Sequence, residues 1–327
     1  MSNGEDIPYQ LRPNKYIDRQ IFMELLSKVV PYKAHGNYVY ISMGGKHLVD
    51  LEAVYRKIGI TKLYSFDGND EVVARQRCNL PHFGAICEKM HSSALPGLLD
   101  QIMHRFKPAQ HMIVWLDYTN VERLAQLQEF CEVLKRCQPG DVVRITMNAQ
   151  AGLNVEEFRK EGFETASQYR AKLLQDQIGD FFPASFVTLK KDDLPRALGA
   201  AVALAASAAS ADTNFEFVPL LSTTYADGQR MFTATVLTKE NDNDCPDGLQ
   251  GWEFLAKGWK NIVEISVPDL SLREKVLIDK HLRKGPQAII NSAKFKPASE
   301  LDEAKVAIQS YKRLHRFYPT FQAMGVN

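Results

Sequence analysis

Between residues 38 and 147 the chain alternates short apolar runs with amphipathic segments, and this alternation limits the possible folds more than any other feature. The apolar runs have the length of strands, and the segments between them have helical periodicity. Strands separated in this way by helices predict a mostly parallel sheet with helices on both faces, since right-handed crossovers leave few other topologies. The predicted strands are 38–43, 62–66, 84–88, 111–116 and 141–147, and the predicted helices are 46–58, 69–78, 94–106 and 121–137.

Two further apolar runs, at 215–221 and 231–238, flank the turn Tyr225-Ala-Asp-Gly228. Apolar runs around an Asp-Gly turn are typical of a β-hairpin. Residues 37–239 are therefore predicted to form a doubly wound, seven-stranded Rossmann-like α/β domain. Its expected strand order is 3-2-1-4-5-7-6, with only strand 231–238 antiparallel. A dehydrogenase-type sheet would end on another parallel unit instead.

Helical segments are expected on both sides of this domain and inside its second half. Asn14 is a candidate N-cap for a helix over 15–30, so that residues 1–36 form a helical segment packed on the core. A polar helix is expected from Asn154 to about Gly179, followed by an alanine-rich helix over 197–211. After a polar linker at 240–248, residues 249–327 should form a small, mainly helical appendage, with a strand at 262–267 and helices at 270–282 and 301–317.

Composition indicates an ordinary globular protein of a reducing compartment. The five cysteines are odd in number and contain no CxxC pair, which argues against a disulfide framework and a structural zinc site. The eight histidines have no ligand spacing, so no metal is expected. The first fifteen residues lack the apolar stretch of a secretory signal. The alanine-rich run is shorter than the roughly 20 apolar residues of a membrane span. We therefore expect a cytoplasmic protein that does not bind membranes.

Charge is balanced overall but uneven along the chain. The formal net charge is +1, so nothing global draws the protein to nucleic acid. Residues 273–316, however, contain eleven Lys and Arg against five Asp and Glu, a local charge of +6 that leaves about −5 for the remainder. This basic C-terminal surface is either a solvated face or a site for an anionic partner, nucleic acid or protein.

Ligands of doubly wound sheets bind outside the carboxyl ends of the strands. The first strand ends in Ser42-Met43-Gly44-Gly45, where glycines let backbone approach a ligand or simply form a turn. The second ends in Asp67-Gly68. An acidic residue here can accept hydrogen bonds from both hydroxyls of a ribose, or it can stabilise the following helix N-terminus.

The fourth strand ends in Asp117 and Tyr118. A carboxylate at this strand end could orient an amine or hydroxyl nucleophile, or take its proton. We therefore interpret Asp117 and Tyr118 as candidate catalytic residues. The charged start of the first helix (Arg12, Lys15, Asp18 and Arg19) is either a solvated cap or a lid over the cofactor.

The chain resembles the class I S-adenosylmethionine-dependent methyltransferases, and in particular a group of bacterial O-methyltransferases. The strand-end motifs above carry part of this resemblance. Short segments elsewhere carry the rest, so that it covers most of the chain: Tyr9 to Lys15 (YQLRPNK), Tyr38 to Gly45 (YVYISMGG), Ser65 to Asp67, Trp115 to Tyr118 (WLDY), Tyr225 to Gly228 and Val267 to Glu274 (VPDLSLRE).

This resemblance implies S-adenosylmethionine as cofactor and methyl transfer as reaction, with no particular acceptor. It also implies that Ser92 lies near the adenine and that Asp117 faces the transferred methyl group. The Asp-Tyr pair is similar to the Asp-Pro-Pro-Tyr of amino-methyltransferases, although the prolines are missing. The Gly-Gly pair is shorter than the family's usual Gly-x-Gly-x-Gly, which favours an alternative: a non-catalytic module that binds a nucleotide or a partner protein. A third hypothesis is a nucleic-acid-binding protein that uses the basic surface together with Tyr311, Phe317 and Tyr318.

Overall fold

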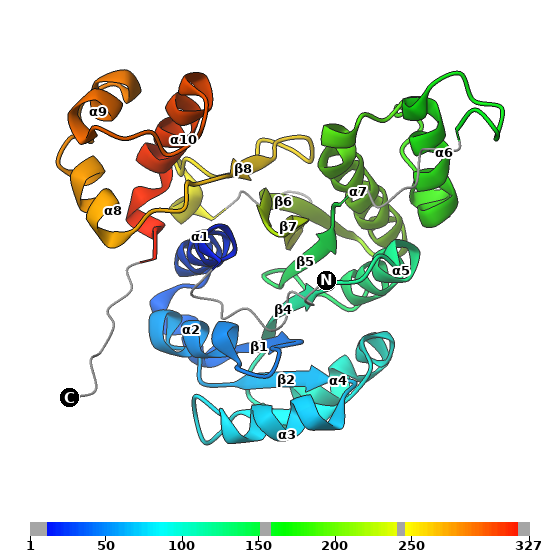
Figure 1. Ribbon diagram of the computed structural model, residues 1–327. Coiled ribbons are helices and arrows are strands. Elements are labelled where there is room, and N and C mark those ends of the chain that lie inside the picture. Colours follow the sequence, from blue (N-terminus) through cyan, green and yellow to red (C-terminus); the bar gives the residue numbers. More distant parts are fainter. Residues whose placement is uncertain (1–11, 151–157, 241–245, 320–327) are drawn as a thin grey trace. The chain divides into compact units, whose positions relative to one another are not determined.

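The computed structural model describes residues 12–150, 158–240 and 246–319, and a single sheet organises most of them (Figure 1). The strand order is β3-β2-β1-β4-β5-β7-β6-β8. Strands β1 to β5 pair in parallel, and β7 runs antiparallel to β5. The predicted order is confirmed, and the strand expected at 262–267 forms the eighth strand at the edge. The strands are β1 (Tyr38–Ser42), β2 (Leu63–Asp67), β3 (Ile86–Lys89), β4 (His111–Asp117), β5 (Val142–Asn148), β6 (Phe215–Asp227), β7 (Gln229–Glu240) and β8 (Val263–Ile265).

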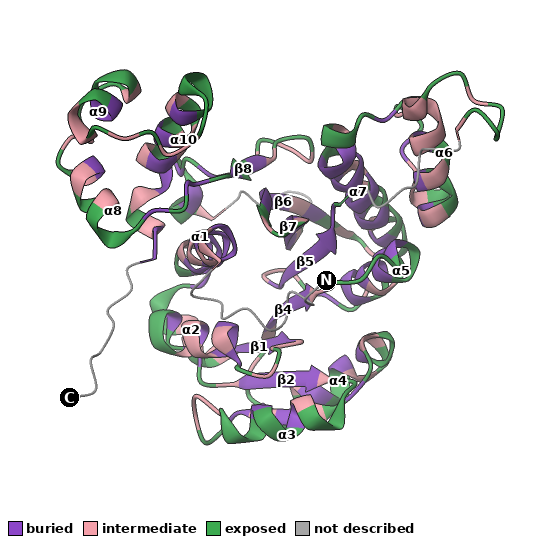
Figure 2. Ribbon diagram, in the orientation of Figure 1, coloured by how far each residue is buried: buried purple, intermediate pink, exposed green. Residues whose placement is uncertain are grey.

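Helices follow the first four strands as the sequence predicts. The apolar sides of α4 (Leu95–Arg105), α5 (Arg123–Leu134) and α7 (Leu194–Asp212) form one continuous core with alternate residues of the strands. α2 (Val49–Ile58) contacts β1, and α3 (Asp70–Cys78) contacts β2 and β3. Strands β1 and β5 are buried at every position, and β2 and β4 at every position except their ends (Figure 2). Because burial removes apolar surface from water, this core supplies the main driving force for folding.

The alanine-rich segment is helix α7, and it is packed against α5. Small side chains at 197, 201, 205 and 209 recur at helical spacing and are fully buried, which lets neighbouring backbones approach. Lys191–Asp212 is long and apolar enough to cross a membrane by length and composition, but 56% of its most apolar window is buried inside the protein. The predicted packed helix is confirmed.

Two local predictions were wrong in detail, and one helix was not predicted. The polar helix expected from residue 154 is α6 (Ala166–Ile178), which begins only at Ala166. Residues 154–157 lie outside the described residues, and 158–165 form turns and bends. Gly162 has a left-handed φ of 79°, and Thr165 closes a capping box with Gln168 that starts the helix. Strand β3 begins two residues later than expected, at Ile86. An additional helix, α9 (Pro286–Ala293), begins at a Gly-Pro pair that is a helix-start signal.

The described chain divides into two compact units. Of the described residues, one unit comprises 12–22, Tyr225–Arg230 and 264–319, and the other comprises 23–150, 158–224, 231–240 and 246–263. The first contains α8 (Leu272–Asp279), α9 and α10 (Leu301–Leu314), and the second contains the sheet up to Val263. Helix α1 (Pro13–Val29) belongs to both. The domain boundaries expected from the sequence, at 36/37 and between 239 and 249, stay a prediction.

The start of α1 corrects the expected N-cap. The helix begins at Pro13, and Asn14 lies inside it. The cap is Asp227 from the β6–β7 turn, whose carboxylate accepts the backbone N–H of Asn14 (3.3 Å) and of Lys15 (2.7 Å). The Asn14 side chain instead donates to the Ala226 carbonyl (3.0 Å) and accepts from the Val267 N–H (2.8 Å). Lys15, Asp18 and Arg19 are buried, so the solvated-cap reading was also wrong.

Candidate functional site

A cavity of about 270 Å³ lies at the carboxyl ends of the first four strands. These strands are parallel, so their carboxyl ends meet at one edge of the sheet. The strand order reverses between β1 and β4, and the cavity lies at this switch point, where doubly wound folds bind ligands. Its lining comes from the strand ends (Met43, Phe66, Asp67, Gly68, Met90, His91, Ser92, and 117–120) and from α5 and the residue before it (Glu122, Ala125, Gln126, Glu129).

The cavity brings together six of the nine residues predicted from the sequence. Met43, Asp67, Gly68, Ser92, Asp117 and Tyr118 all line it, although they come from four different strand ends. Ser42, Gly44 and Gly45 do not. The roles of all nine stay predictions; the structure shows where they lie.

The glycine pair after β1 forms a turn that is closed by its own hydrogen bonds. Ser42 Oγ accepts the Gly44 N–H (3.1 Å) and donates to Asp50 Oδ2 (2.5 Å). Gly44 and Gly45 have left-handed φ values of 52° and 55°, which glycine adopts without strain. A Cβ on Gly44 would also stand 2.2 Å from Ser65 Oγ, whereas a Cβ on Gly45 would meet nothing within 4 Å. Of the four residues Ser42 to Gly45, Met43 lines the cavity, and the other three shape the turn next to it.

The cavity is acidic. Four carboxylates line it, those of Asp67, Asp117, Glu122 and Glu129, and none of the described lining residues is Lys or Arg. Asp67 is held in place because its Oδ1 accepts the N–H of Asn69 (2.8 Å). Four carboxylates gathered in a partly enclosed cavity favour a cationic ligand.

Comparison with known proteins identifies the family. A family model described as "Putative O-methyltransferase" matches residues 7–326, nearly the whole chain. The protein belongs to this family. The description of this family names O-methyl transfer as its reaction. Among curated proteins, none matches the chain.

Solved structures similar to the methyltransferase have low identity to it. The chain is similar to Trm1 from Pyrococcus horikoshii in complex with S-adenosyl-L-methionine, at 12% identity and a TM-score of 0.47, over 70% of this chain and 56% of that one. It therefore spans little more than half the length of Trm1. It is also similar to an O-methyltransferase from Bacillus cereus in complex with SAH, at 11% identity and a TM-score of 0.37, over 72% and 84% of the two chains.

The Tyr118 hydroxyl of the methyltransferase is already engaged within the protein. It donates to Glu129 Oε2 at 2.5 Å, and its ring is buried. Burial, and then the hydrogen bond to Glu129, raise the pKa of Tyr118 far above its ordinary value. Tyr118 is therefore a neutral phenol that cannot act as a base at neutral pH. Tyr118 forms part of the cavity wall, and its hydroxyl holds the Glu129 carboxylate in position.

Gln126 supplies a buried acceptor that the sequence reading missed. The side chain is 2% exposed, and its Nε2 donates to the carbonyl (3.2 Å) and to Oδ1 (2.5 Å) of Asn120. Its Oε1 has no hydrogen-bond partner within the described part of the chain. A buried acceptor without a partner is costly, and a ligand N–H would remove that cost. Glu122, Gln126 and Glu129 are spaced four and three residues apart, so a polar stripe at this helical spacing was the available signal.

Proposed function

We propose that this cavity holds S-adenosylmethionine and that Asp117 binds the hydroxyl group of the methyl acceptor and receives its proton. The observation that supports this most is the gathering of four carboxylates, those of Asp67, Asp117, Glu122 and Glu129, at the switch point of the sheet. S-adenosylmethionine, when bound, supplies an electrophilic methyl group on a positively charged sulfonium. An acidic cavity suits such a cation, and the family supports oxygen as the accepting atom.

The residues present fit the parts of this cofactor. Asp67, at the end of β2, is placed to accept hydrogen bonds from both ribose hydroxyls. The Gln126 Oε1 is an acceptor suited to the exocyclic amine of adenine, and Ser92 and His91 lie on the adjacent strand end. Met43, Phe66 and Met90 supply the apolar surface that a purine ring requires.

Asp117 is the remaining carboxylate on a strand end. It terminates β4, is half-buried, and lies opposite Thr146 in the β4–β5 register. A carboxylate there can hold an acceptor hydroxyl by a hydrogen bond and receive its proton as the new bond forms. Such help is worth about 10²–10⁴ in rate.

The test is the variant Asp117→Asn, which keeps the size and hydrogen-bonding capacity of the side chain but removes its charge. Transfer of labelled methyl into protein, nucleic-acid and small-molecule fractions of a cell extract should fall by about 10²–10⁴, while affinity for S-adenosylhomocysteine is kept. Asp70→Asn is the matched control, because Asp70 is an exposed carboxylate just after β2 that pairs with Lys89 and does not line the cavity. Equal labelling by wild type and Asp117→Asn would exclude Asp117 as the base. If the wild type neither labels any fraction nor binds the cofactor, a non-catalytic module is the better account.

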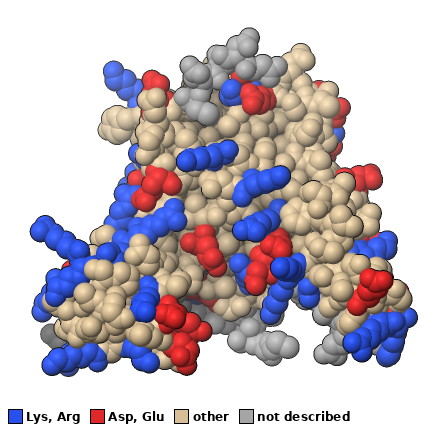
Figure 3. Space-filling view, turned by 90° about the horizontal axis from the view of Figure 1, so that it is seen from above, with Lys and Arg blue, Asp and Glu red and all other residues tan. Residues whose placement is uncertain are grey.

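A second candidate function concerns the basic surface of the helical unit, residues 273–316. Figure 3 shows Lys and Arg side chains on one face of the molecule, interspersed with Asp and Glu. The last turn of α10 contributes Lys312 and Arg313, and the first turn carries Asp302 and Glu303, so charge is segregated along this helix. Tyr311 and Tyr318 are buried and bound to Asp279 and to the backbone around Leu270, so they are not available to stack on bases. We propose that nucleic acid binds this surface through phosphate contacts rather than by stacking on Tyr311 or Tyr318.

A further inference from the structure

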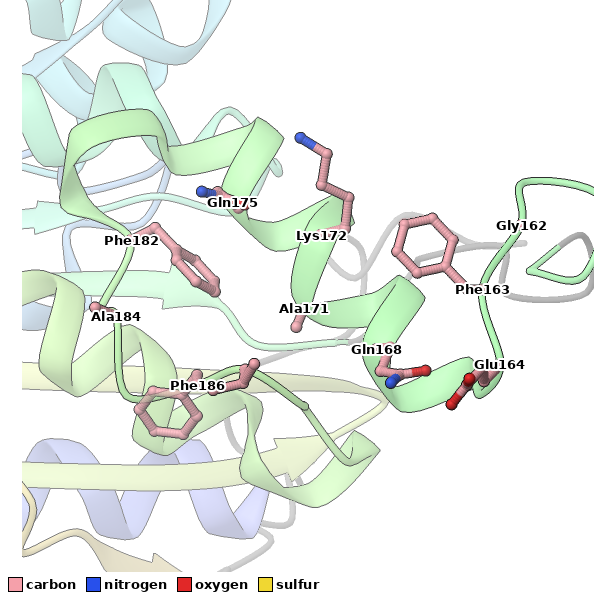
Figure 4. Close-up of a pocket in the computed structure, with 11 residues that line it drawn as sticks. Gly162, Phe163, Glu164, Gln168, Ala171, Lys172, Gln175, Phe182, Ala184 and Phe186 are labelled. Atoms are coloured by element: carbon pink, nitrogen blue, oxygen red, sulfur yellow. The ribbon is translucent and has the colours of Figure 1, made fainter.

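The acidic cavity contains a buried polar group that a ligand would satisfy. Gln126 is 2% exposed and lines this cavity, and its Oε1 has no hydrogen-bond partner among the described residues. A larger hollow, of about 570 Å³, lies beside α6, but of its described lining residues only Ala171 is buried (Figure 4). A buried acceptor without a partner indicates that the acidic cavity takes a ligand with an N–H or O–H donor.

Gln126 and Glu129 of α5 can offer a ligand only hydrogen-bond acceptors. Both N–H bonds of the Gln126 amide are used, because Nε2 donates to the carbonyl (3.2 Å) and to Oδ1 (2.5 Å) of Asn120. Only its oxygen is left. Glu129, as a carboxylate, has no hydrogen atom to donate. A ligand group that binds to these two side chains must therefore supply the hydrogen atoms.

Tyr118 holds Glu129 in one arrangement. Its hydroxyl donates to Glu129 Oε2 (2.5 Å), which leaves Glu129 Oε1 for a ligand. Burial and Glu129 raise the pKa of Tyr118, and a hydrogen bond from the Ser92 side chain to its oxygen offsets a part of this rise. Ser92 follows β3, and Tyr118 follows β4. Two strand ends thus fix the position of a carboxylate on α5.

The two free oxygens are close enough to bind one amino group. Gln126 and Glu129 are three residues apart on α5, so they are neighbours on one face of the helix, with Cβ atoms about 5–6 Å apart. An amino group on an aromatic ring has two N–H bonds in the plane of the ring, one for each oxygen. An oxo group in its place would turn lone pairs toward both acceptors and leave both without a hydrogen bond.

We propose that Gln126 Oε1 and Glu129 Oε1 bind the two hydrogen atoms of the adenine exocyclic amine, and that Tyr118 is a positioning residue that holds Glu129 for this contact. The inference rests on the proposed function, in which the cavity holds S-adenosylmethionine. It gives Tyr118 a role in recognising the cofactor rather than in proton transfer. The site accordingly selects adenine against a purine that carries an oxo group in place of the amine.

The test compares S-adenosylhomocysteine with S-inosylhomocysteine, its deaminated form, by calorimetric titration of the full chain. The ratio of the two Kd values reports recognition of the amine, whereas a purely structural defect weakens both ligands alike. The variants are Tyr118→Phe, which keeps the buried ring, and Glu129→Gln, which keeps the size of the side chain. Glu132→Gln is the matched control, because Glu132 is an exposed carboxylate of the same helix that pairs with Lys135 and does not line the cavity.

We expect wild type and Glu132→Gln to bind S-adenosylhomocysteine at least about 100-fold more tightly than S-inosylhomocysteine, since two hydrogen bonds are replaced by two unpartnered acceptors. The ratio should fall to about tenfold in Tyr118→Phe, where Glu129 is no longer held, and in Glu129→Gln, whose amide can donate to the oxo group.

Equal affinity of the wild type for the two ligands overturns the inference. An unchanged ratio in Glu129→Gln overturns the assignment of Glu129, and an unchanged ratio in Tyr118→Phe overturns the positioning role of Tyr118. If the wild type binds neither ligand, the proposed function itself fails, which is a different result from binding both equally.

Discussion

Replacing Asp67 by Ala tests the assignment of the cofactor site most directly. Asp67 ends β2 and lines the acidic cavity, and its Oδ1 accepts the N–H of Asn69 at 2.8 Å. Asn69 in turn caps α3 by accepting the Glu71 N–H. This short relay holds the carboxylate at the carboxyl edge of the sheet, at the position where a ribose would present its two hydroxyls.

The size of the effect follows from these contacts. Each hydrogen bond to a charged group is worth roughly 1.5–3 kcal/mol, and one carboxylate oxygen is shared with Asn69. The loss on Asp67→Ala should therefore be about 2–4 kcal/mol, which corresponds to about a 30-fold to 700-fold rise in Kd. Without ligand the variant loses the bond from Asn69 at a partly exposed site, so the stability of the free protein should fall by about 1 kcal/mol, less than the ligand affinity.

The measurement is calorimetric titration of S-adenosylmethionine and S-adenosylhomocysteine into wild type, Asp67→Ala and Asp67→Asn, with thermal melting of each free protein. Asp70→Ala is the control, since it removes a carboxylate three residues away that does not line the cavity. We expect Asp67→Asn to lose less affinity than Asp67→Ala. Unchanged affinity in Asp67→Ala, or an equal loss in Asp70→Ala, would refute the ribose assignment.

Three further results are expected. Gly44→Ala and Gly45→Ala both place Ala at positive φ, but only the new Cβ at position 44 would meet Ser65. Urea unfolding should therefore show Gly44→Ala to be less stable than Gly45→Ala by on the order of 1–3 kcal/mol. Equal losses of stability would contradict the close packing of Gly44 on Ser65. If the basic surface binds a single-stranded RNA, affinity must fall steeply with salt, and substituting Lys312, Arg313 and Arg316 must flatten that dependence; binding that ignores salt leaves a solvated face. Burial, and then Asp141, raise the pKa of Tyr38 to about 12, so its contribution to stability is complete below about pH 10 and is lost as pH rises toward 12; Tyr38→Phe should reduce this alkaline loss, as followed by circular dichroism.

Hydrophobic periodicity was enough to predict the sheet, because burial in a doubly wound fold repeats locally along the chain. Strands such as β4, which is buried over most of its length, have an unbroken apolar pattern, and Asp117 marks the point where that pattern stops. Asp67 and Asp117 could be found in this way, since strand ends of parallel strands share one edge. β5 was found despite Arg144, which is buried, lies over the ring of Trp115 at 5.0 Å and donates to Thr235.

Contacts between distant parts of the chain were not predictable from these patterns. Glu129 and Gln126 line the cavity because α5 packs across the strand ends, and a polar stripe on a helix usually indicates solvent. Asp227 caps α1 from more than two hundred positions away, so no local signal could distinguish it from a turn residue. The cavity of about 570 Å³ beside α6 likewise exists because the loops before and after this helix fold back onto it.

The sequence by itself therefore determined the order of the strands, the class of fold, and the position of Asp67 and Asp117 at strand ends. Each of these depends on the alternation of apolar and polar side chains over a few residues. The tertiary structure alone decided which of those ends share a cavity, that the Gly44-Gly45 turn supports the site without lining it, and that the Tyr118 hydroxyl is occupied by Glu129. These outcomes depend on long-range packing, in which a side chain's partner is set by the whole fold rather than by its neighbours in the chain.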